Sequence, residues 1–317
     1  MPVLFFSILI LSCQKESIEI SQPQSALFNH LEVILPSGYD PEILNYGQDD
    51  YERLFDSSQK NARISGNDAP LNLNELTLLL RNVKNKYPDL SKMEEKEIDK
   101  ALKYFTKMDK KGINENRETA LDFFDKLISY DLTKEINKAQ SVKSNRRVVS
   151  YPYQLNSCEF WWLISHPRFA DRVEYATNKA LEFETQKFGS NSGGTHGDAF
   201  RHAVWNALLA KHGGENYGSV STAVSLASQF TYLHEACASE GTEIDHGMDL
   251  HNNGVGLTYF SSVGYTYKVW CFIICNYNVT GPDDQTMADA IYAKPVVLVN
   301  SVSDIDNTNF YTLVKLQ

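Results

Sequence analysis

The stretch HGDAFRHAVWNALLAKHGG, residues 196–214, decides the fold. Alanines recur at positions 199, 203, 207 and 210, and large apolar side chains fill most of the positions between them. On a helical wheel, Lys211 is the one side chain within the helix that plainly requires water. A helix without a solvent face is a buried helix, and an alanine stripe lets a neighbouring helix approach closely. The stretch therefore predicts a helix buried inside an α-helical domain.

The same helix carries polar side chains that are costly to bury. Asp198, His202 and Trp205 share one narrow arc of the wheel, with Arg201 and Asn206 at its edges. A buried acid, arginine or histidine is strongly destabilising unless it has a partner. Asp198 and His202 are four residues apart, so the carboxylate can hold the imidazole in one tautomer. Arg201 needs a carboxylate from another part of the chain.

Two later segments offer such partners. SLASQFTYLHEACAS places His234 and Glu235 on a largely apolar helix, which we expect to cover 218–238. DHGMDLHNNGVG places Asp249, Asn252 and Asn253 within one compact stretch. We expect a short helix near 245–252, which the NNG sequence ends. Convergence of the three segments predicts a polar pocket inside a helical core.

The motifs DAFRHAVWNALLA, HE and MDLHNNGVG resemble an uncharacterised family of bacterial domains, described only as a domain of unknown function. Its pattern is Asp-Ala-x-Arg-His-x-x-Trp-Asn, a later His-Glu, and Met-Asp-x-x-Asn-Asn-x-x-Gly. The resemblance covers residues 158–256, with weaker support to about residue 293. His196, Cys237 and the cysteines near position 270 lie outside the pattern, as does the N-terminal helical region. The resemblance implies no established activity.

A hydrolase is the first hypothesis for the pocket. His202, oriented by Asp198, would act as a general base that activates water. Arg201, or the amides of Asn252 and Asn253, would stabilise developing negative charge. Glu235 or Asp249 would orient His234 or act as the acid. The candidate catalytic residues are therefore Asp198, Arg201, His202, His234, Glu235, Asp249, Asn252 and Asn253.

Two alternatives stay open beside this hypothesis. Five of these residues have donor atoms suitable for Zn²⁺ or another divalent ion, namely Asp198, His202, His234, Glu235 and Asp249. The zincin spacing is missing, because HEACA has Ala238 where a second histidine should stand. In the other alternative, the same side chains form a structural buried polar network in a non-catalytic binding or interaction domain.

The N-terminal sequence predicts that the protein is located at a membrane. VLFFSILILSC is an apolar run that stops at Cys13, too short to span a bilayer and of the length of a signal peptide's core. Leu11-Ser12-Cys13 is similar to a bacterial lipobox, although no Lys or Arg precedes the apolar run. We expect a signal peptide over 1–13 with lipidation at Cys13, and a polar tether over 14–30. The alternative is a buried N-terminal strand.

This location predicts a lipid-anchored protein of the bacterial cell envelope, at the outer membrane or the periplasmic face, in an oxidising compartment. Cys158, Cys237, Cys271 and Cys275 then allow three pairings, among which the sequence does not choose. The substrate or protein partner is unknown. A net charge of −10 argues against nucleic acid as a partner.

The remaining pattern predicts a mainly α fold. Amphipathic helices follow one another over residues 31–139, and we expect a helical N-terminal region with its linker over 31–150 that acts as a spacer. A multi-helix C-terminal domain over 151–317 carries the pocket. Alternating apolar residues after about residue 296 predict a small amount of β structure near the C-terminus.

Overall fold

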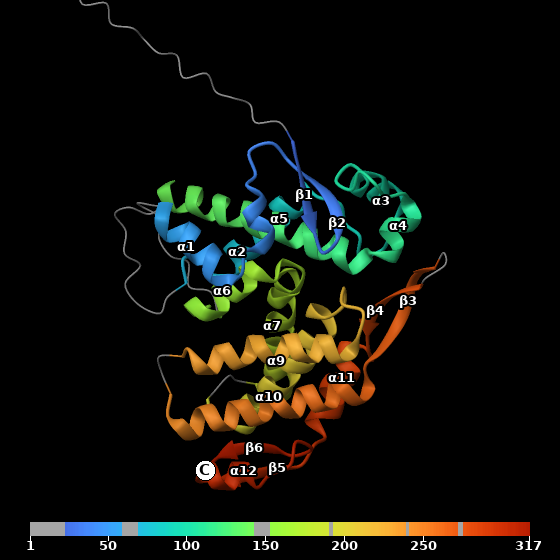
Figure 1. Cartoon of the computed structure of the whole chain (residues 1–317). Coiled ribbons are helices and arrows are strands. Elements are labelled where there is room, and N and C mark those ends of the chain that lie inside the picture. The colour runs from blue at the N-terminus through green and yellow to red at the C-terminus, as the bar shows by residue number, and fades with distance from the viewer. Residues whose placement is uncertain (1–22, 59–68, 143–152, 190–192, 239–240, 272–274) are drawn as a thin grey trace, which may run out of the picture.

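A computed structural model describes residues 23–58, 69–142, 153–189, 193–238, 241–271 and 275–317 (Figure 1). The described residues form twelve α-helices and three small two-stranded sheets, which confirms the mainly α prediction. β5 and β6 confirm the β structure expected after about residue 296, whereas β3 and β4 precede that point and were not predicted. Cys13 and the predicted signal peptide lie outside the described residues. No helix among the described residues is long and apolar enough to cross a membrane.

The first half of the chain forms the upper part of the molecule in Figure 1, which we call the N-terminal layer. Its elements are β1 (Gln24–Phe28), β2 (Leu31–Leu35), the 3₁₀ helix η1 (Pro41–Asn45), α1 (Gln48–Ser58), α2 (Leu73–Lys84), α3 (Glu95–Ala101), α4 (Lys110–Glu115) and α5 (Arg117–Val142). β1 and β2 form an antiparallel hairpin. The last part of the polar tether predicted for 14–30 differs from that expectation, because residues 24–28 form β1 and the Phe28 side chain is buried.

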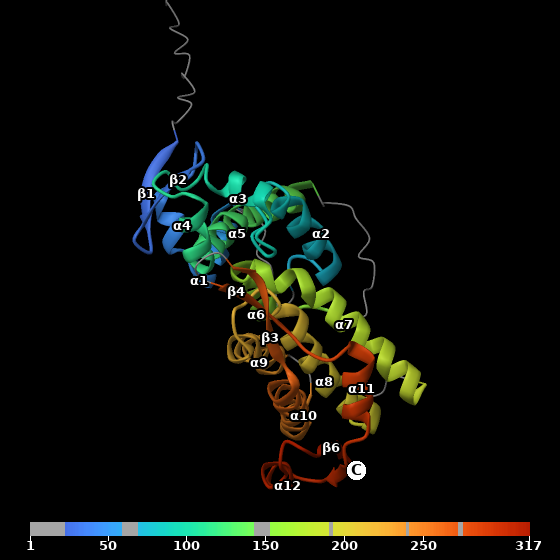
Figure 2. The ribbon, with the colours of Figure 1, turned by 90° about the vertical axis from the view of Figure 1, so that its right-hand side faces the viewer.

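The second half forms the C-terminal layer. Its elements are α6 (Ser157–Ser165), α7 (Pro167–Phe188), α8 (His196–Leu208), the π-helical turn η2 (Leu209–Gly213), α9 (Val220–Ala236), α10 (Glu243–Val263), β3 (Tyr265–Cys271), β4 (Cys275–Thr280), α11 (Asp284–Tyr292), β5 (Val296–Val299), α12 (Val302–Asp306) and β6 (Leu313–Leu316). Figure 2 shows α7 running from the N-terminal layer along the side of the C-terminal layer. One hydrophobic core cluster takes in side chains from both layers.

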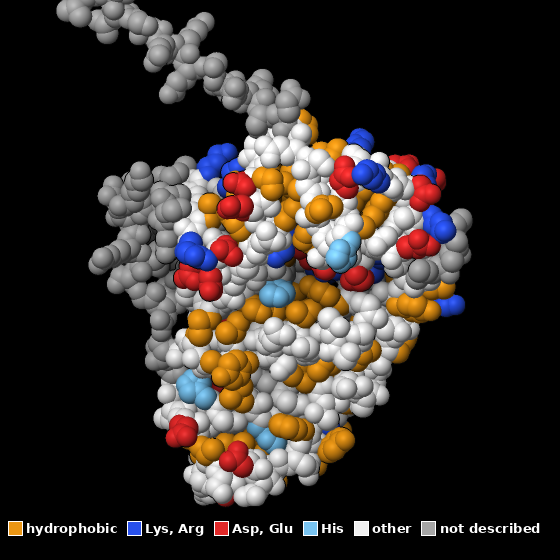
Figure 3. Space-filling model, viewed as in Figure 1, with side chains coloured by type: hydrophobic (Ala, Val, Ile, Leu, Met, Phe, Trp, Pro, Cys, Tyr) orange, Lys and Arg blue, Asp and Glu red, His pale blue; other side chains and the backbone are white. Residues whose placement is uncertain are grey.

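Arg168 joins the two layers. Its side chain, at the start of α7, is buried and lies 2.6 Å from carboxylate oxygens of both Asp122 and Asp125 on α5. The ring of Phe55 on α1 also packs against Trp161 on α6. On the face shown in Figure 3, Lys and Arg side chains gather over the N-terminal layer, where acidic side chains are interleaved with them.

α8 is the buried helix that its alanine stripe predicted. Apart from Arg201, every residue from Gly197 to Leu208 is buried. α10 approaches α8 closely at Gly256, where an added Cβ would lie 1.9 Å from the carbonyl oxygen of Ala203. The small residues on both helices thus set the close approach that brings their polar side chains together.

The predicted third helix was too short. α10 continues through Asn252, Asn253 and Gly254 to Val263, so the NNG sequence does not end it. Asn252 donates a hydrogen bond to the Val314 carbonyl and accepts one from the Val314 amide, which fixes β6 against the helix. These tertiary bonds outweigh the tendency of Asn and Gly to terminate a helix.

Cys158 and Cys237 form a disulfide, which settles one pairing that the sequence left open. The bond joins the first turn of α6 to the residue that follows α9. It therefore ties together two helices that are far apart in sequence.

Candidate metal centre and cavity

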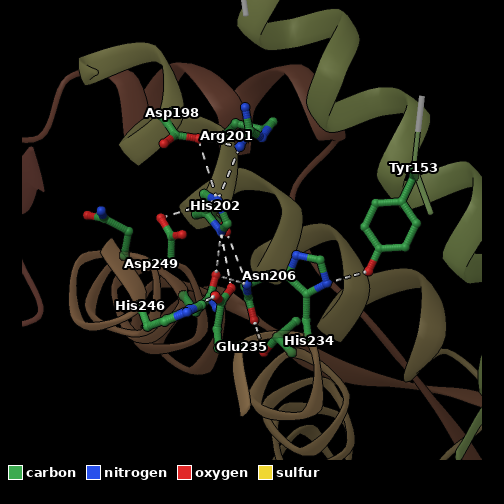
Figure 4. Close-up of polar contacts among 12 residues, drawn as sticks. Tyr153, Asp198, Arg201, His202, Asn206, His234, Glu235, His246 and Asp249 are labelled. Atoms are coloured by element: carbon green, nitrogen blue, oxygen red, sulfur yellow. Dashed lines mark hydrogen bonds and ion pairs between the residues drawn. The ribbon is translucent and has the colours of Figure 1, made fainter. Parts of the chain in front are cut away.

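His202 on α8 lies at the centre of the polar group drawn in Figure 4. Its Nε2 atom is 3.5 Å from Asp198 Oδ1 on the same helix and 3.3 Å from Asp249 Oδ1 on α10. The contact between Asp198 and His202 is the one that their four-residue spacing predicted. Side-chain exposure is 7% for His202, 5% for Asp198 and 18% for Asp249, so the three groups are largely removed from water.

Hydrogen bonds on the other side of the ring fix the tautomer. Thr231 donates to Asn206 Oδ1 over 2.9 Å, so the Asn206 amide nitrogen faces Asn253 and donates to its Oδ1 over 2.6 Å. The same Asn253 oxygen lies 3.2 Å from His202 Nδ1 and can accept only if Nδ1 carries the proton. The Nε2 atom therefore presents its lone pair to Asp198 and Asp249.

The carboxylate of Asp249 has no hydrogen donor where it meets the ring. Its Oδ1 is buried and accepts no hydrogen bond from any described residue. Burial, followed by the nearby Glu235 and Asp198 carboxylates, raises the pKa of Asp249 to about 8. Burial, followed by the Arg201 charge, holds the pKa of His202 well below its usual 6.5. Two acceptor atoms that face each other at 3.3 Å require a cation, either a proton or a metal ion, between them.

Arg201 was expected to need a carboxylate from another part of the chain. Glu184 on α7 supplies this carboxylate. Arg201 Nη1 lies 3.3 Å from Glu184 Oε2, and the Glu184 side chain is fully buried. Arg201 Nη2 donates to Asp198 Oδ1 and lies 3.2 Å from His202 Nε2. The guanidinium group thus competes with any metal ion for Asp198 and for the imidazole lone pair.

His234 and Glu235 lie outside the Asp198–His202–Asp249 group. Glu235 Oε1 is 4.0 Å from the opposite ring nitrogen of His202, and its Oε2 is 3.3 Å from His246 Nδ1. His234 Nδ1 instead lies 3.0 Å from Oε1 of Glu159 on α6.

The neighbouring residues Asn252 and Asn253 also have different partners. Asn253 contacts His202, whereas Asn252 binds the Val314 backbone and takes no part in the site.

Glu184 and Glu159 were not predicted from the sequence, and Asn206 was expected only at the edge of the polar arc. Glu159 carried a readable signal. It is a single acid within the apolar sequence SCEFWWLIS, and its side chain is fully buried.

Asp198, His202 and Asp249 are the set that could hold a metal ion. One ligand atom from each residue lies within 4.8 Å of the other two. Imidazole nitrogen and carboxylate oxygen together suit Zn²⁺ and related divalent ions.

A cavity of about 290 Å³ adjoins this group. Its lining side chains are Tyr153, Gln154, Thr177, Ala180, Leu181, Arg201, His202, Trp205 and His234, together with Gly193. Polar groups from α8 and α9 therefore face one space whose remaining walls are mostly aromatic and aliphatic. A volume of this size admits a small molecule or one end of a larger one.

Comparison with known families agrees with the resemblance seen in the motifs. Residues 160–279 match the family model of DUF6973, a domain of unknown function. The DUF6973 segment begins within α6 and ends in β4, so it contains α8, α9 and α10 and every residue of the Asp198–His202–Asp249 group. Glu159 and Tyr153 precede the matched segment. No curated protein and no solved structure matches the chain.

Proposed function

We propose that the DUF6973 segment is a metal-dependent hydrolase in which Asp198, His202 and Asp249 hold a divalent cation such as Zn²⁺. The observation that carries this proposal is the convergence of three ligand atoms from two helices, one of which, Asp249 Oδ1, accepts no hydrogen bond from the described residues. The lone pair of His202 Nε2 faces the same point.

The charge balance of the region supports a cation. The buried or half-buried carboxylates around His202 and His234 are Asp198, Asp249, Glu235, Glu184 and Glu159. They face two cations, Arg201 and His234, and the ring of His246, which contacts Glu235. Uncompensated charge is expensive in a site with little water, and a divalent ion offsets more of it than a shared proton does.

Three protein ligands and an adjoining cavity favour catalysis over a purely structural ion. Structural zinc sites are closed by four protein ligands, whereas catalytic sites keep a position for water. A bound divalent ion lowers the pKa of that water enough to make it a nucleophile near neutral pH. Arg201 lines the cavity and supplies a positive group for developing negative charge. Metal binding requires Arg201 Nη2 to give way, while Nη1 keeps its contact with Glu184.

A structural role is the second candidate. It is favoured by the hydrogen-bonded chain from Thr231 through Asn206 and Asn253 to His202, and by the two carboxylates that already hold Arg201. In that case the polar group would fix the packing of α8 against α9 and α10 without binding a metal.

Metal analysis combined with activity separates the two candidates. Purified wild-type protein should contain close to one equivalent of divalent metal and hydrolyse at least one member of an ester, amide and phosphoester panel, with loss of activity in EDTA and recovery with Zn²⁺. Asp249→Asn should lose both properties, while Glu243→Gln, which removes an exposed charge from the same helix, should keep them. Metal-free wild-type protein without hydrolytic activity would favour the structural candidate.

We also propose that Cys13 carries a lipid anchor that places the protein in the bacterial cell envelope. The Cys158–Cys237 disulfide supports an oxidising compartment. Labelling with radioactive palmitate in a bacterial host tests this proposal. Wild-type protein should be labelled and sediment with membranes, and Cys13→Ser should be unlabelled. Labelling that persists in Cys13→Ser would contradict it.

A further inference from the structure

A second histidine faces the cavity from α9. His234 Nδ1 lies 3.0 Å from Oε1 of the fully buried Glu159, and the Tyr153 hydroxyl donates to the same carboxylate oxygen. Figure 4 shows the Tyr153 hydroxyl 3.2 Å from His234 Nδ1. The rings of Tyr153 and His234 stack, with their centroids 5.4 Å apart. This arrangement orients an imidazole through one nitrogen with a buried acid.

Several bonds hold Glu159 and His234 in register. Asn156 caps α6 in a reciprocal capping box with Glu159, and its amide group also donates to the backbone carbonyls of Leu233 and His234. The Cys158–Cys237 disulfide joins the same two helix ends. Such a fixed geometry is what a proton-transfer group needs, because proton transfer requires hydrogen-bonding distance to the reacting atom.

The other ring nitrogen of His234 is available to a ligand. Both hydrogen-bond contacts of the ring with described residues engage Nδ1, and none engages Nε2. The side chain is 29% exposed and lines the cavity together with His202 and Arg201.

His234 is charged under ordinary conditions. Burial opposes the charge, but the hydrogen bond and the negative charge of Glu159 outweigh it and raise the pKa of His234 to about 9. The Nε2 atom therefore carries a proton at neutral pH that it can donate into the cavity.

We propose that His234, positioned by Glu159, is the general acid of the hydrolase, and that the substrate is a carboxylic ester of an unactivated alcohol. This inference rests on the proposed function. Water oxygen bonds to the acyl carbon, the bond from that carbon to the alcohol oxygen breaks, and His234 Nε2 gives its proton to the departing oxygen. The attacking water loses a proton to solvent, and solvent reprotonates His234, so no further reactant is needed.

The charges favour a carboxylic ester over a phosphate ester. Five carboxylates stand around two histidines and Arg201, so even with a divalent cation the region has no surplus of positive charge. A neutral ester adds no charge, whereas a phosphodiester adds another anion. Ala180, Leu181 and Trp205 provide an apolar wall for an acyl chain.

Leaving-group dependence tests this role. p-Nitrophenolate departs without a proton, whereas ethoxide needs one, so ethyl and p-nitrophenyl esters of the same acyl group should respond differently to loss of the acid. His234→Gln should lower kcat for the ethyl ester by about 100-fold or more, and for the p-nitrophenyl ester by less than about tenfold. Glu159→Gln, which keeps the imidazole, should also lower kcat more for the ethyl ester than for the p-nitrophenyl ester, but by a smaller factor. The exposed His30→Gln serves as the matched control.

Three outcomes would overturn the inference. Equal losses on both esters in Glu159→Gln, or in a folded His234→Gln, would show that His234 acts only through packing. Hydrolysis confined to phosphate esters would refute the substrate class and leave the metal-dependent hydrolase intact. Failure of the metal-loaded wild-type protein to hydrolyse any substrate of the panel would remove the proposed function and this inference together.

Discussion

The substitution Gly256→Ala tests the close packing of α8 against α10. Helix propensity alone predicts that it raises the stability of the protein, whereas the close packing predicts that it lowers it. Replacing a glycine by alanine inside a helix ordinarily stabilises it by about 1 kcal/mol. At Gly256, however, the new Cβ would lie 1.9 Å from the Ala203 carbonyl oxygen and 2.7 Å from its carbonyl carbon. Both atoms belong to the backbone, so no rotamer change relieves the clash, and α8 and α10 must move apart by more than about 1 Å.

We therefore expect Gly256→Ala to lower the free energy of unfolding by about 2 kcal/mol, because an overpacking cost of about 3 kcal/mol outweighs a propensity gain of about 1 kcal/mol. The shift should also weaken zinc binding, since His202 precedes Ala203 and Asp249 lies two turns before Gly256. Urea unfolding followed by circular dichroism measures the first effect, and calorimetric titration with Zn²⁺ measures the second. Gly218→Ala, where the methyl group would meet no atom within 4 Å, is the control and should be close to neutral. A Gly256→Ala protein as stable as wild type would refute the close approach of the two helices.

Three further variants test separate parts of the structure. Asp284→Asn should destabilise the protein at pH 7, because contacts with the Lys211 ammonium and the His212 ring of η2 hold the pKa of this carboxyl below its usual value against the effect of burial. A carboxyl whose pKa is depressed by folding stabilises the protein above its unfolded pKa, so the difference from wild type should begin to shrink as the pH falls below about 4 and should disappear only below the depressed folded value. A constant difference in urea titrations across pH would contradict this. Asn252→Ala leaves the Val314 amide and carbonyl without partners and should cost roughly 1–3 kcal/mol without changing zinc affinity; weaker zinc binding would count against a purely structural role. Opening the 79-residue disulfide loop by Cys158→Ser with Cys237→Ser should lower the unfolding free energy by about 4 kcal/mol, which denaturant titration measures and which an unchanged midpoint would disprove.

The sequence was sufficient for the parts of the structure that depend on local periodicity. Alanine spacing predicted the buried α8, and the four-residue spacing of Asp198 and His202 predicted their contact. Hydrophobic periodicity also located α9 to within two residues at each end. In each case the relevant information lies within one helix.

Partners from other helices were harder to predict. Glu184 and Glu159 approach Arg201 and His234 only after α6, α7 and α9 pack together. The predicted length of α10 was wrong for the same reason, because Asn252 is held by a strand 62 residues away. A buried acid in an apolar helix can be recognised from the sequence, but its partner depends on the tertiary fold.

The most direct test of the metal centre is an anomalous difference map from crystals grown with Zn²⁺. The proposal predicts one peak about 2.0–2.2 Å from Asp198 Oδ1, His202 Nε2 and Asp249 Oδ1, with Arg201 Nη2 displaced toward Glu184. A map with no peak there, and with Arg201 still 3.2 Å from His202 Nε2, would contradict it.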